Sequence, residues 1–408
     1  MKNLANGVIE TTDGRYIRIL EIEPINFMLR SDEEQFNIIS SFASWLKISP
    51  MRMQFKSMTR KADSDRHVAM VRAELEAEEN ESCKRLGEGY IRLIKDVGSR
   101  EALTRRFFLI FQYEELRRGD GEDYGQVLSM MQAAEQTARA YFFQCGNSIL
   151  DPKDPDEATA EILYMFFNRR SCVDEPFQSR VNRVVIDTMA TKQKVIGIDP
   201  VPHIRISNFL APRGIDLNHH HYVVMDGLYY TFLYIKGNGY PSMVRAGWMS
   251  SLINAGEGVD VDVFLRRENR SKSIDKVAQR IRLNRTKLKS MQDTSSDYEE
   301  LANSIQSGYY IKHGLSNNED LFYLSIFVTV SAKSYEELMW RKQQMVDMLK
   351  SMDMYVSDCR FQQEAAFRSV MPFVSCSSVG VEKLMRNASH GSFSSVKNAV
   401  PGTTQTFF

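Results

Sequence analysis

Hydrophobic and polar residues follow a regular order at the start of the chain. The segment from Gly7 to Pro24 is rich in β-branched and aromatic residues around Asp13-Gly14, a dipeptide that favours a tight turn, so it predicts a β-hairpin. Ser31, with Glu34 three residues later, has the pattern of a capping box, and apolar residues at helical spacing follow. Residues 51–58 alternate apolar and polar side chains, which is typical of a half-buried strand.

Similar patterns predict further elements up to about Thr191. Residues 63–97 have the composition of one long charged helix with a weak point at Gly87 and Gly89, because glycine lowers helix propensity. Residues 106–113 (RFFLIFQY) are apolar enough for a central strand, and residues 122–145 have an apolar helical face. Two more helices complete this part of the chain.

The second half of the chain repeats this order of elements. Three prolines within residues 196–214 indicate a domain boundary. A hairpin around Asp226-Gly227 is then predicted over residues 222–235. The segments that follow are predicted as a helix (245–254), a strand (259–265), a basic helix (from about 271), a helix (296–306), a strand (321–330), a helix (334–351) and a strand (354–361).

These elements predict an α+β protein with mixed sheets, helices packed on them, and two ferredoxin-like subdomains. The first subdomain is expected at residues 1–195 and the Pro-rich boundary at 196–214. The second subdomain, which contains the basic helix, is expected at 215–385. Residues 386–408 are rich in Ser and Thr and are expected to form a disordered tail.

Composition is that of a folded, intracellular protein. The chain has 408 residues, of which 43% are hydrophobic and 25% charged, and the 52 basic residues balance the 52 acidic ones. This balance provides no overall field that would attract nucleic acid or an anionic membrane. The five cysteines are far apart, which excludes a zinc ribbon and favours reduced thiols. No signal peptide or bilayer-spanning stretch is expected, because the longest apolar runs are too short.

The search for catalytic motifs gives no candidate. The sequence contains no GxxxxGK[ST], no Gly-Lys dipeptide, and none of GxSxG, HExxH or GxGxxG. His219-His220-His221 is the only histidine cluster, but neighbours on a strand point to opposite faces, so a polar start of the following strand is favoured over a metal site. Cys145 and Cys172 have no histidine nearby in the sequence. No catalytic, cofactor-binding or metal-binding residue is therefore expected.

One segment, residues 266–289, is strongly basic, with only Glu268 and Asp275 opposing its positive charge. Such an excess can bind a phosphate backbone or an acidic partner. The segment has no aromatic residues that would stack on bases, and a solvated helix face is the favoured interpretation. The candidate surface consists of Arg266, Arg267, Arg270, Lys276, Arg280, Arg282, Arg285 and Lys289.

Several long stretches resemble one known family. Residues 13–50 (DGRYIRILEIEPINFMLRSDEEQFNIISSFASWLKISP) resemble the opening of TraE-like conjugal transfer ATPases, the CagE/TrbE/VirB group of type IV secretion systems. Residues 99–114 (SREALTRRFFLIFQYE), residues 307–332 (SGYYIKHGLSNNEDLFYLSIFVTVSA) and the basic segment resemble the same group in the same order. The resemblance extends to about Arg386.

In that family, the N-terminal region leads into a RecA-like motor domain with a phosphate-binding loop and lysine, which this chain lacks. The resemblance implies an assembly and docking region at the cytoplasmic face of the cell membrane. Its implied partners are inner-membrane secretion subunits and the motor domain, with homo-oligomers as a further arrangement. ATP and Mg²⁺ would serve only the motor, so this chain alone should not hydrolyse ATP. The alternatives are a nucleic-acid-binding module at residues 266–289, or a truncated ATPase whose motor lies in a missing part.

Overall fold

The fold is that of a computed structural model, which describes residues 1–61, 64–78, 80–98, 103–113, 124–193, 206–237, 239–241, 244, 246–290, 296–317, 319–374, 379–388 and 390–393. In this part of the chain, 13 strands form one sheet flanked by helices, which confirms the predicted α+β class. All the strand pairings described are antiparallel, so the expected mixed sheets are in fact one antiparallel sheet.

The first half of the chain forms one ferredoxin-like unit. Its four main strands follow the order β6-β3-β5-β4, with α1 and α4 as crossover helices and a helical hairpin inserted between β4 and β5. The elements are β1 (Asn3–Ala5), β2 (Val8–Glu10), β3 (Tyr16–Glu23), η1 (Phe27–Leu29), α1 (Asp32–Leu46), β4 (Arg52–Lys61), α2 (Ser64–Ala77), α3 (Glu81–Gly98), β5 (Leu103–Gln112), α4 (Tyr124–Gln144) and β6 (Ser148–Ile149).

The second half forms a second unit with the same plan. Its strands follow the order β12-β9-β11-β10, and its helical hairpin is inserted between β10 and β11. The elements are β7 (Ile215–Asp216), β8 (Val223–Met225), β9 (Leu228–Ile235), α9 (Ser250–Ile253), β10 (Val259–Arg267), α10 (Arg270–Ser290), α11 (Ser296–Ser316), β11 (Leu321–Ala332), α12 (Tyr335–Ser351) and β12 (Val356–Asp358).

The two units join edge to edge through β4 and β10, which pair from Arg52↔Arg266 to Ser57↔Val261. The resulting strand order is β1-β2-β3-β5-β4-β10-β11-β9-β8-β7. Read inward from either edge, each strand of one unit has its counterpart at the same position in the other unit. The domain limits at residues 195 and 215 remain predictions. The two units on either side of them share one sheet. Of the predicted boundary, residues 194–205 lie outside the described part, and α8 (Ile206–Leu210) follows.

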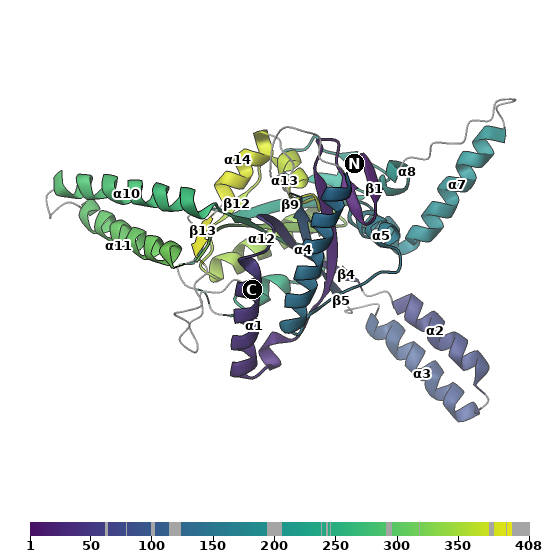
Figure 1. Ribbon diagram of the computed structural model, residues 1–408. Coiled ribbons are helices and arrows are strands. Elements are labelled where there is room, and N and C mark those ends of the chain that lie inside the picture. The colour runs from purple at the N-terminus through teal and green to yellow at the C-terminus, as the bar shows by residue number, and fades with distance from the viewer. Residues whose placement is uncertain are drawn as a thin grey trace.

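Helices cover both faces of this sheet (Figure 1). Side chains from α1, α4, α9 and α12 form one apolar core on the first face. On the second face, α5 packs against the first unit and α13 against the second. The elements that follow each unit are α5 (Pro155–Phe167), α6 (Ser171–Asp174), α7 (Phe177–Gln193), α13 (Gln363–Val370), α14 (Val379–Ala388) and β13 (His390–Phe393).

The structure confirms two predicted features that depend only on neighbouring residues, the capping box at Ser31 and the turn at Asp226-Gly227. Ser31 caps α1, since its backbone N–H donates to the Glu34 carboxylate at 2.9 Å and its hydroxyl accepts from the Glu34 N–H at 3.4 Å. Asp226 and Gly227 have positive φ angles of 53° and 73° and connect β8 to β9. Both angles are those of a tight hairpin turn.

The long helix predicted at residues 63–97 is instead two antiparallel helices. The chain reverses between α2 and α3, and the Asn80 side chain accepts a hydrogen bond from the Ser82 N–H at 2.9 Å at the start of α3. The predicted weak point at Gly87 is inside α3. A Cβ atom there would lie 2.3 Å from Leu75 Cδ2, so glycine allows the two helices to approach closely.

Three other element limits differ from the prediction. The helix expected at 245–254 is only four residues long in α9, whereas α11 extends to Ser316 rather than 306. The disordered tail was expected from 386, but α14 extends to Ala388 and β13 pairs with β11. Hydrogen bonding to a sheet edge orders these residues despite their polar composition. Residues 394–408 lie outside the described part.

Candidate functional site

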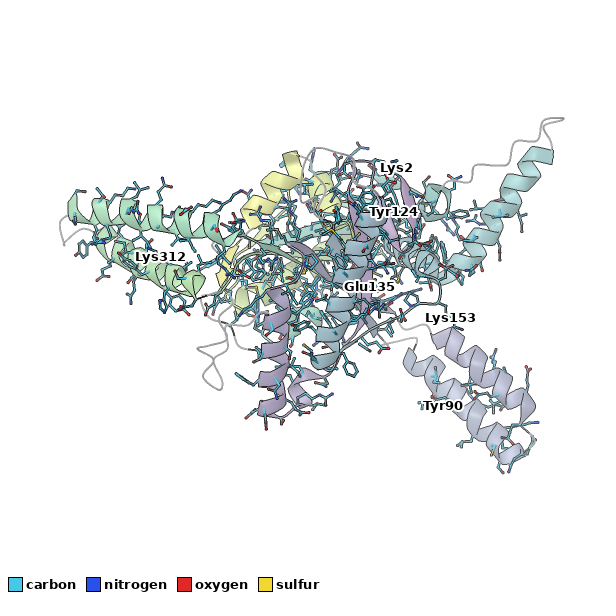
Figure 2. All side chains as sticks on the ribbon, viewed as in Figure 1. Lys2, Tyr90, Tyr124, Glu135, Lys153 and Lys312 are labelled. Carbon is cyan, nitrogen blue, oxygen red and sulfur yellow. The ribbon has the colours of Figure 1, made fainter. Side chains whose placement is uncertain are left out.

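Two helical hairpins project from the central strands, and we call them the α2–α3 arm (residues 64–98) and the α10–α11 arm (residues 270–316). The first follows β4 and the second follows β10. Because β4 and β10 are antiparallel neighbours, the two arms leave the sheet at opposite ends of this strand pair. The arms accordingly extend on opposite sides of the molecule (Figure 1), as do their labelled residues Tyr90 and Lys312 in Figure 2.

Close packing joins the two helices of the α10–α11 arm. A Cβ atom on Gly308 would lie 2.8 Å from Ile281 Cγ1, so the glycine provides the space into which Ile281 packs. Ile281 is 5% exposed. Farther along, the Asn284 side-chain amide donates to the Ser304 hydroxyl at 3.0 Å. These contacts fix which residues of α11 lie beside the basic residues of α10.

Part of the predicted basic surface is used to anchor this arm. Arg270 forms an ion pair with the buried Asp320 carboxylate at 2.8 Å. Lys276 pairs with Glu268 at 2.9 Å, and this hydrogen bond raises the pKa of the lysine. These two cations are therefore partly neutralised at the base of the arm.

Arg266 and Arg267 belong to the end of β10 rather than to the helix. The Arg266 guanidinium lies over the Tyr323 ring, 4.9 Å from its centroid. Arg267 donates a hydrogen bond to the backbone carbonyl of Lys47. Arg266 therefore packs against the neighbouring strand β11, whereas Arg267 joins the end of β10 to the end of α1.

The outer half of α10 carries the remaining predicted residues. Arg280, Arg282 and Lys289 are exposed and form no ion pair with another described residue. Arg285 is also exposed, and its guanidinium donates to the Tyr309 hydroxyl at 3.1 Å. The structure thus divides the predicted surface into an anchoring base and a basic outer end.

Aromatic residues lie beside this basic outer end, which sequence analysis did not anticipate. Tyr309 and Tyr310 of α11 are each 45% exposed. The basic segment itself contains no aromatic residue, and only the pairing of α10 with α11 brings Tyr309 to Arg285. The sequence did contain one sign of these aromatic residues, the adjacent pair Tyr309-Tyr310. Composition does not show, however, how α10 and α11 align along each other, so it does not place this pair beside Arg285.

Sequence analysis also missed the outer end of the α2–α3 arm. Residues 74–81 contain five glutamates and no basic residue. Of these, Glu74, Glu76 and Glu81 are exposed and form no ion pair with another described residue. On α3, the Leu86 and Leu93 side chains are 78% and 59% exposed, at a spacing that places them on one side of the helix.

The histidines of the cluster pack against aromatic side chains. His219 stacks on Tyr222 with ring centroids 4.2 Å apart, and its Nε2 lies 3.2 Å from the Asp216 carboxylate. His220 instead packs against Phe361. Within the described residues, no group of three or more His, Cys, Asp and Glu side chains is placed to hold a metal ion.

The two cysteines considered as nucleophiles are buried thiols. Burial raises the pKa of Cys145 to about 11 and also raises that of Cys172. A raised thiol pKa reduces the thiolate fraction at neutral pH, and the thiolate is the reactive form. The geometry thus gives neither cysteine the environment of an activated nucleophile.

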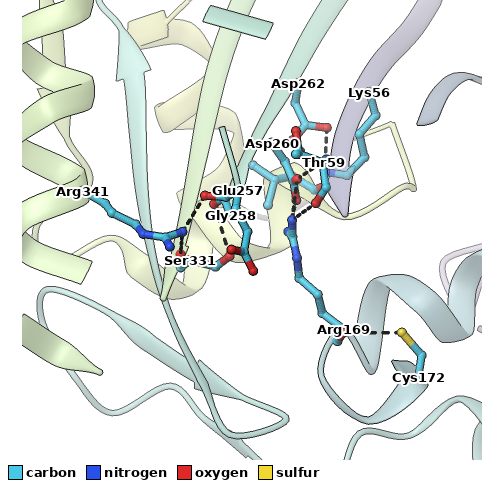
Figure 3. Close-up of polar contacts among 11 residues, drawn as sticks. Lys56, Thr59, Arg169, Cys172, Glu257, Gly258, Asp260, Asp262, Ser331 and Arg341 are labelled. Atoms are coloured by element: carbon cyan, nitrogen blue, oxygen red, sulfur yellow. Dashed lines mark hydrogen bonds and ion pairs between the residues drawn. The ribbon is translucent and has the colours of Figure 1, made fainter. Parts of the chain in front are cut away.

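A buried polar cluster lies under the β4–β10 pair on the second face of the sheet (Figure 3). The Lys56 ammonium, 5% exposed, is 2.8 Å from the Asp262 carboxylate, which is fully buried. Gln54 also donates to Asp262 at 2.8 Å, and Lys56 donates to the Val370 carbonyl of α13 at 3.1 Å. Burial raises the pKa of Asp262 to about 6, although Lys56 acts in the opposite direction.

Arg169, which follows α5, extends this cluster toward the first unit (Figure 3). Its guanidinium forms an ion pair with Asp260 and donates to the Thr59 carbonyl. The next turn is held by Asp226, whose carboxylate accepts from the Ser171 N–H at 2.6 Å. This cluster joins the two units, and several of its side chains line a small cavity of about 30 Å³.

A cavity opens on the first face of the sheet, between α1 and α9. It has a volume of about 760 Å³ and is lined mostly by apolar side chains, among them Phe42, Phe55 and Val263. Arg105 also lines it, and the arginine Nε donates to the Ile253 carbonyl at 3.1 Å. The opening occurs where α9 of the second unit is much shorter than α1 of the first.

Comparison with known families gives one result, and it falls on the first unit. Residues 3–133 match the family model of the archaeal TraC-like domain. The TraC-like match covers β1 through β5, the whole α2–α3 arm and the first half of α4. It fits the resemblance of this region to the N-terminal region of conjugal transfer ATPases.

The TraC-like match covers about a third of the chain and stops before the second unit. No curated protein matches the sequence. In the described part of the chain, no helix combines the length and the apolar composition that crossing a bilayer requires.

Proposed function

We propose that the chain is an assembly and docking region of a conjugative DNA-transfer ATPase of the type IV secretion class. The observation that carries the proposal is the TraC-like match over the first unit, including its arm. The second unit has the same strand order and also carries an arm, so the chain presents two projecting surfaces on one sheet. Such a scaffold offers contact surfaces to other proteins.

The partners we propose are inner-membrane subunits of the secretion system and the RecA-like motor domain. Contact with the membrane subunits would hold the chain at the cytoplasmic face of the membrane. ATP and Mg²⁺ are proposed to act in the motor domain, because this sequence has no Gly-Lys dipeptide with which to build a phosphate-binding loop. The truncated-ATPase alternative differs only in placing that motor in the same polypeptide.

Fractionation of donor cells tests the docking role. The tagged chain is expected to sediment with membranes when the secretion subunits are present, and to remain in the supernatant when they are deleted. Crosslinking to an inner-membrane subunit would identify the contact. A chain that remains in the supernatant of both strains would contradict the proposal.

A second measurement tests where nucleotide acts. The purified chain is expected to release no phosphate from ATP in the presence of Mg²⁺, and to bind no fluorescent ATP analogue. The matched control is the same chain mixed with a purified motor domain from the same transfer system, which should release phosphate. Turnover that copurifies with the chain through successive columns would contradict the assignment.

A further inference from the structure

The cavity between α1 and α9 has a floor made by three neighbouring strands of the sheet. Five side chains of β4, β5 and β10 line it from this side: Phe55, Ser57, Phe107, Val261 and Val263. Ser57 is paired with Phe107 on β5 and with Val261 on β10, so these three side chains share one face of the sheet. The floor is therefore apolar except for the Ser57 hydroxyl, which forms no hydrogen bond with another described residue.

Helices on the same face of the sheet form the walls. Helices α1, α4 and α9 contribute the apolar residues Ile38, Ile39, Phe42, Phe142 and Ile253. The ring centroid of Phe42 lies 6.1 Å from that of Phe142 and 6.2 Å from that of Phe55. Walls and floor therefore form one continuous apolar surface.

The cavity is open to solvent, since the exposed residues Met28, Ser250 and Asn254 also line it. Its volume of about 760 Å³ is within the range of small-molecule sites, about 300–1,000 Å³. Water finds few hydrogen-bonding partners on apolar walls, so an apolar molecule that displaces this water is stabilised by the hydrophobic effect. The cavity is thus suited to an apolar ligand.

Among the described residues that line the cavity, Arg105 provides the charged group available to such a ligand. Arg105 precedes Phe107 by two residues on β5, which places both side chains on the same face of the sheet. Its Nε donates to the Ile253 carbonyl at 3.1 Å, and its guanidinium forms no ion pair with another described residue. Lys56 also lines the cavity, but its ammonium is paired with Asp262 on the other face of the sheet. The described lining contains no further Asp or Glu that would neutralise Arg105.

This arrangement favours an amphiphile with an anionic head. A guanidinium presents parallel N–H donors that match the two oxygens of a carboxylate. An alkyl chain has no polar group and needs no hydrogen bond from the walls. A peptide in the same place would leave backbone N–H and C=O groups unpaired, because the described lining offers few polar side chains beyond Arg105 and Ser57.

We propose that this cavity binds a long-chain fatty acid, with the carboxylate at Arg105 and the alkyl chain between the floor and the phenylalanine rings of the walls. The Ser57 hydroxyl is the further polar group within the cavity. Binding of such a ligand needs neither a secretion subunit nor the motor domain. The proposal therefore holds or fails independently of the docking function.

Equilibrium dialysis of the delipidated full chain against radiolabelled palmitate, kept below the concentration at which it forms micelles, measures the binding. One palmitate per chain is expected. In a series of saturated fatty acids of increasing length, the affinity should rise about fourfold for each added methylene until the cavity is full, because each methylene leaves water for an apolar surface. Absence of saturable binding would overturn the proposal.

The variant Arg105→Gln tests the contact with the carboxylate. It removes the charge, so palmitate should bind at least about tenfold more weakly, the usual effect of losing hydrogen bonds to a charged group. Hexadecanol has the same chain length without the charge and should bind the variant and the natural chain alike. The matched control is Arg282→Gln, at an exposed cation of α10, which should bind palmitate normally. Equal weakening of palmitate and hexadecanol by Arg105→Gln would overturn the proposal.

The variant Ile39→Trp tests where the alkyl chain lies. Ile39 is half-buried on α1, and a larger side chain there takes up space in the cavity. Palmitate and hexadecanol should both bind at least about tenfold more weakly, the effect of excluding two methylenes. The matched control Ile186→Trp is at an exposed position of α7 and should bind both normally. Circular dichroism establishes that each variant is folded, and a folded Ile39→Trp variant with unchanged affinities would overturn the proposal.

A segment of a secretion subunit is the other occupant that an apolar cavity could receive, and fractionation of donor cells distinguishes it. If the chain binds no palmitate, and Ile39→Trp but not Ile186→Trp releases the chain from membranes, the cavity receives a protein segment and the fatty-acid proposal is overturned. If Ile39→Trp loses palmitate and still sediments with membranes, the proposal is supported.

Discussion

Lys56 and Asp262 form a buried ion pair whose two members come from different units. Taking both charges out of water is costly, so the pair is weak evidence of net stability, but an unpaired buried charge is costlier still. We therefore expect Lys56→Met to lower the free energy of unfolding at pH 7 by about 3–5 kcal/mol, because the buried Asp262 carboxylate would lose its counter-charge. Urea denaturation measures this loss.

The double variant Lys56→Met, Asp262→Leu is the control for this prediction. It removes both charges and should cost less than Lys56→Met alone, since no buried charge remains. Equal or additive costs would contradict this account and would assign the stability to the individual hydrogen bonds with Gln54 and Val370.

The same pair predicts a dependence of stability on pH. Burial raises the pKa of Asp262 from 3.8 to about 6, so the folded protein binds this proton more tightly than the unfolded chain does. Its stabilising contribution is complete below about pH 4 and is lost as the pH rises through 6. Between pH 4 and 6.5, the unfolding free energy of the natural chain should fall by on the order of 2 kcal/mol relative to the Lys56→Met, Asp262→Leu variant. Parallel curves would contradict the raised pKa.

Gly258, just before β10, combines a positive φ of 80° with close packing. A Cβ atom there would lie 2.4 Å from the backbone oxygen of Ser331. Gly14 has nearly the same φ, 78°, but nothing lies within 4 Å of its Cβ position. Gly14→Ala should cost about 1–2 kcal/mol, the strain of the left-handed conformation, and Gly258→Ala should cost more. Thermal unfolding compares the two, and equal losses would contradict the close approach.

Each arm is inserted between two strands that are paired with each other, so the sheet should remain intact when an arm is removed. Lys61 and Leu103 are paired on β4 and β5, and Arg267 and Phe322 are paired on β10 and β11. A short turn can therefore replace either arm. We expect deletion of residues 64–98 or 270–316 to remove helical signal in circular dichroism while the remaining protein still unfolds cooperatively. Loss of cooperative unfolding in both deletions would show that the arms support the sheet.

Elements with local signals were predictable from sequence, and those set by distant contacts were not. The capping box of Ser31 and the turn at Asp226-Gly227 depend on neighbouring residues, so composition and spacing were sufficient. The alternation in β4 predicted one exposed face, yet Gln54 and Lys56 are buried, because α13 covers them from more than 300 residues away. Similarly, the basic segment was visible as charge, but its division into base and outer end depends on Asp320 and Glu268.

At the scale of the whole molecule, the continuous sheet predicts that the two units unfold together. Separating them would expose the edges of β4 and β10 and leave the buried charges of Lys56 and Asp262 apart. Trp45 reports on the first unit, and Trp248 and Trp340 on the second. Fluorescence of variants that retain only one of these probes should give the same urea midpoint as circular dichroism. Two separate midpoints would instead favour independent subdomains.

The antiparallel β4–β10 pair also determines how the molecule would bear a mechanical load. A pull applied between the two arms draws β4 and β10 lengthwise past each other, since the arms leave opposite ends of this pair. All the hydrogen bonds between the strands then share the force at once, rather than opening one after another as they do when strands are peeled apart. The sheet therefore resists tension best along the direction of these strands. The molecule can transmit force between two partners bound to its two arms.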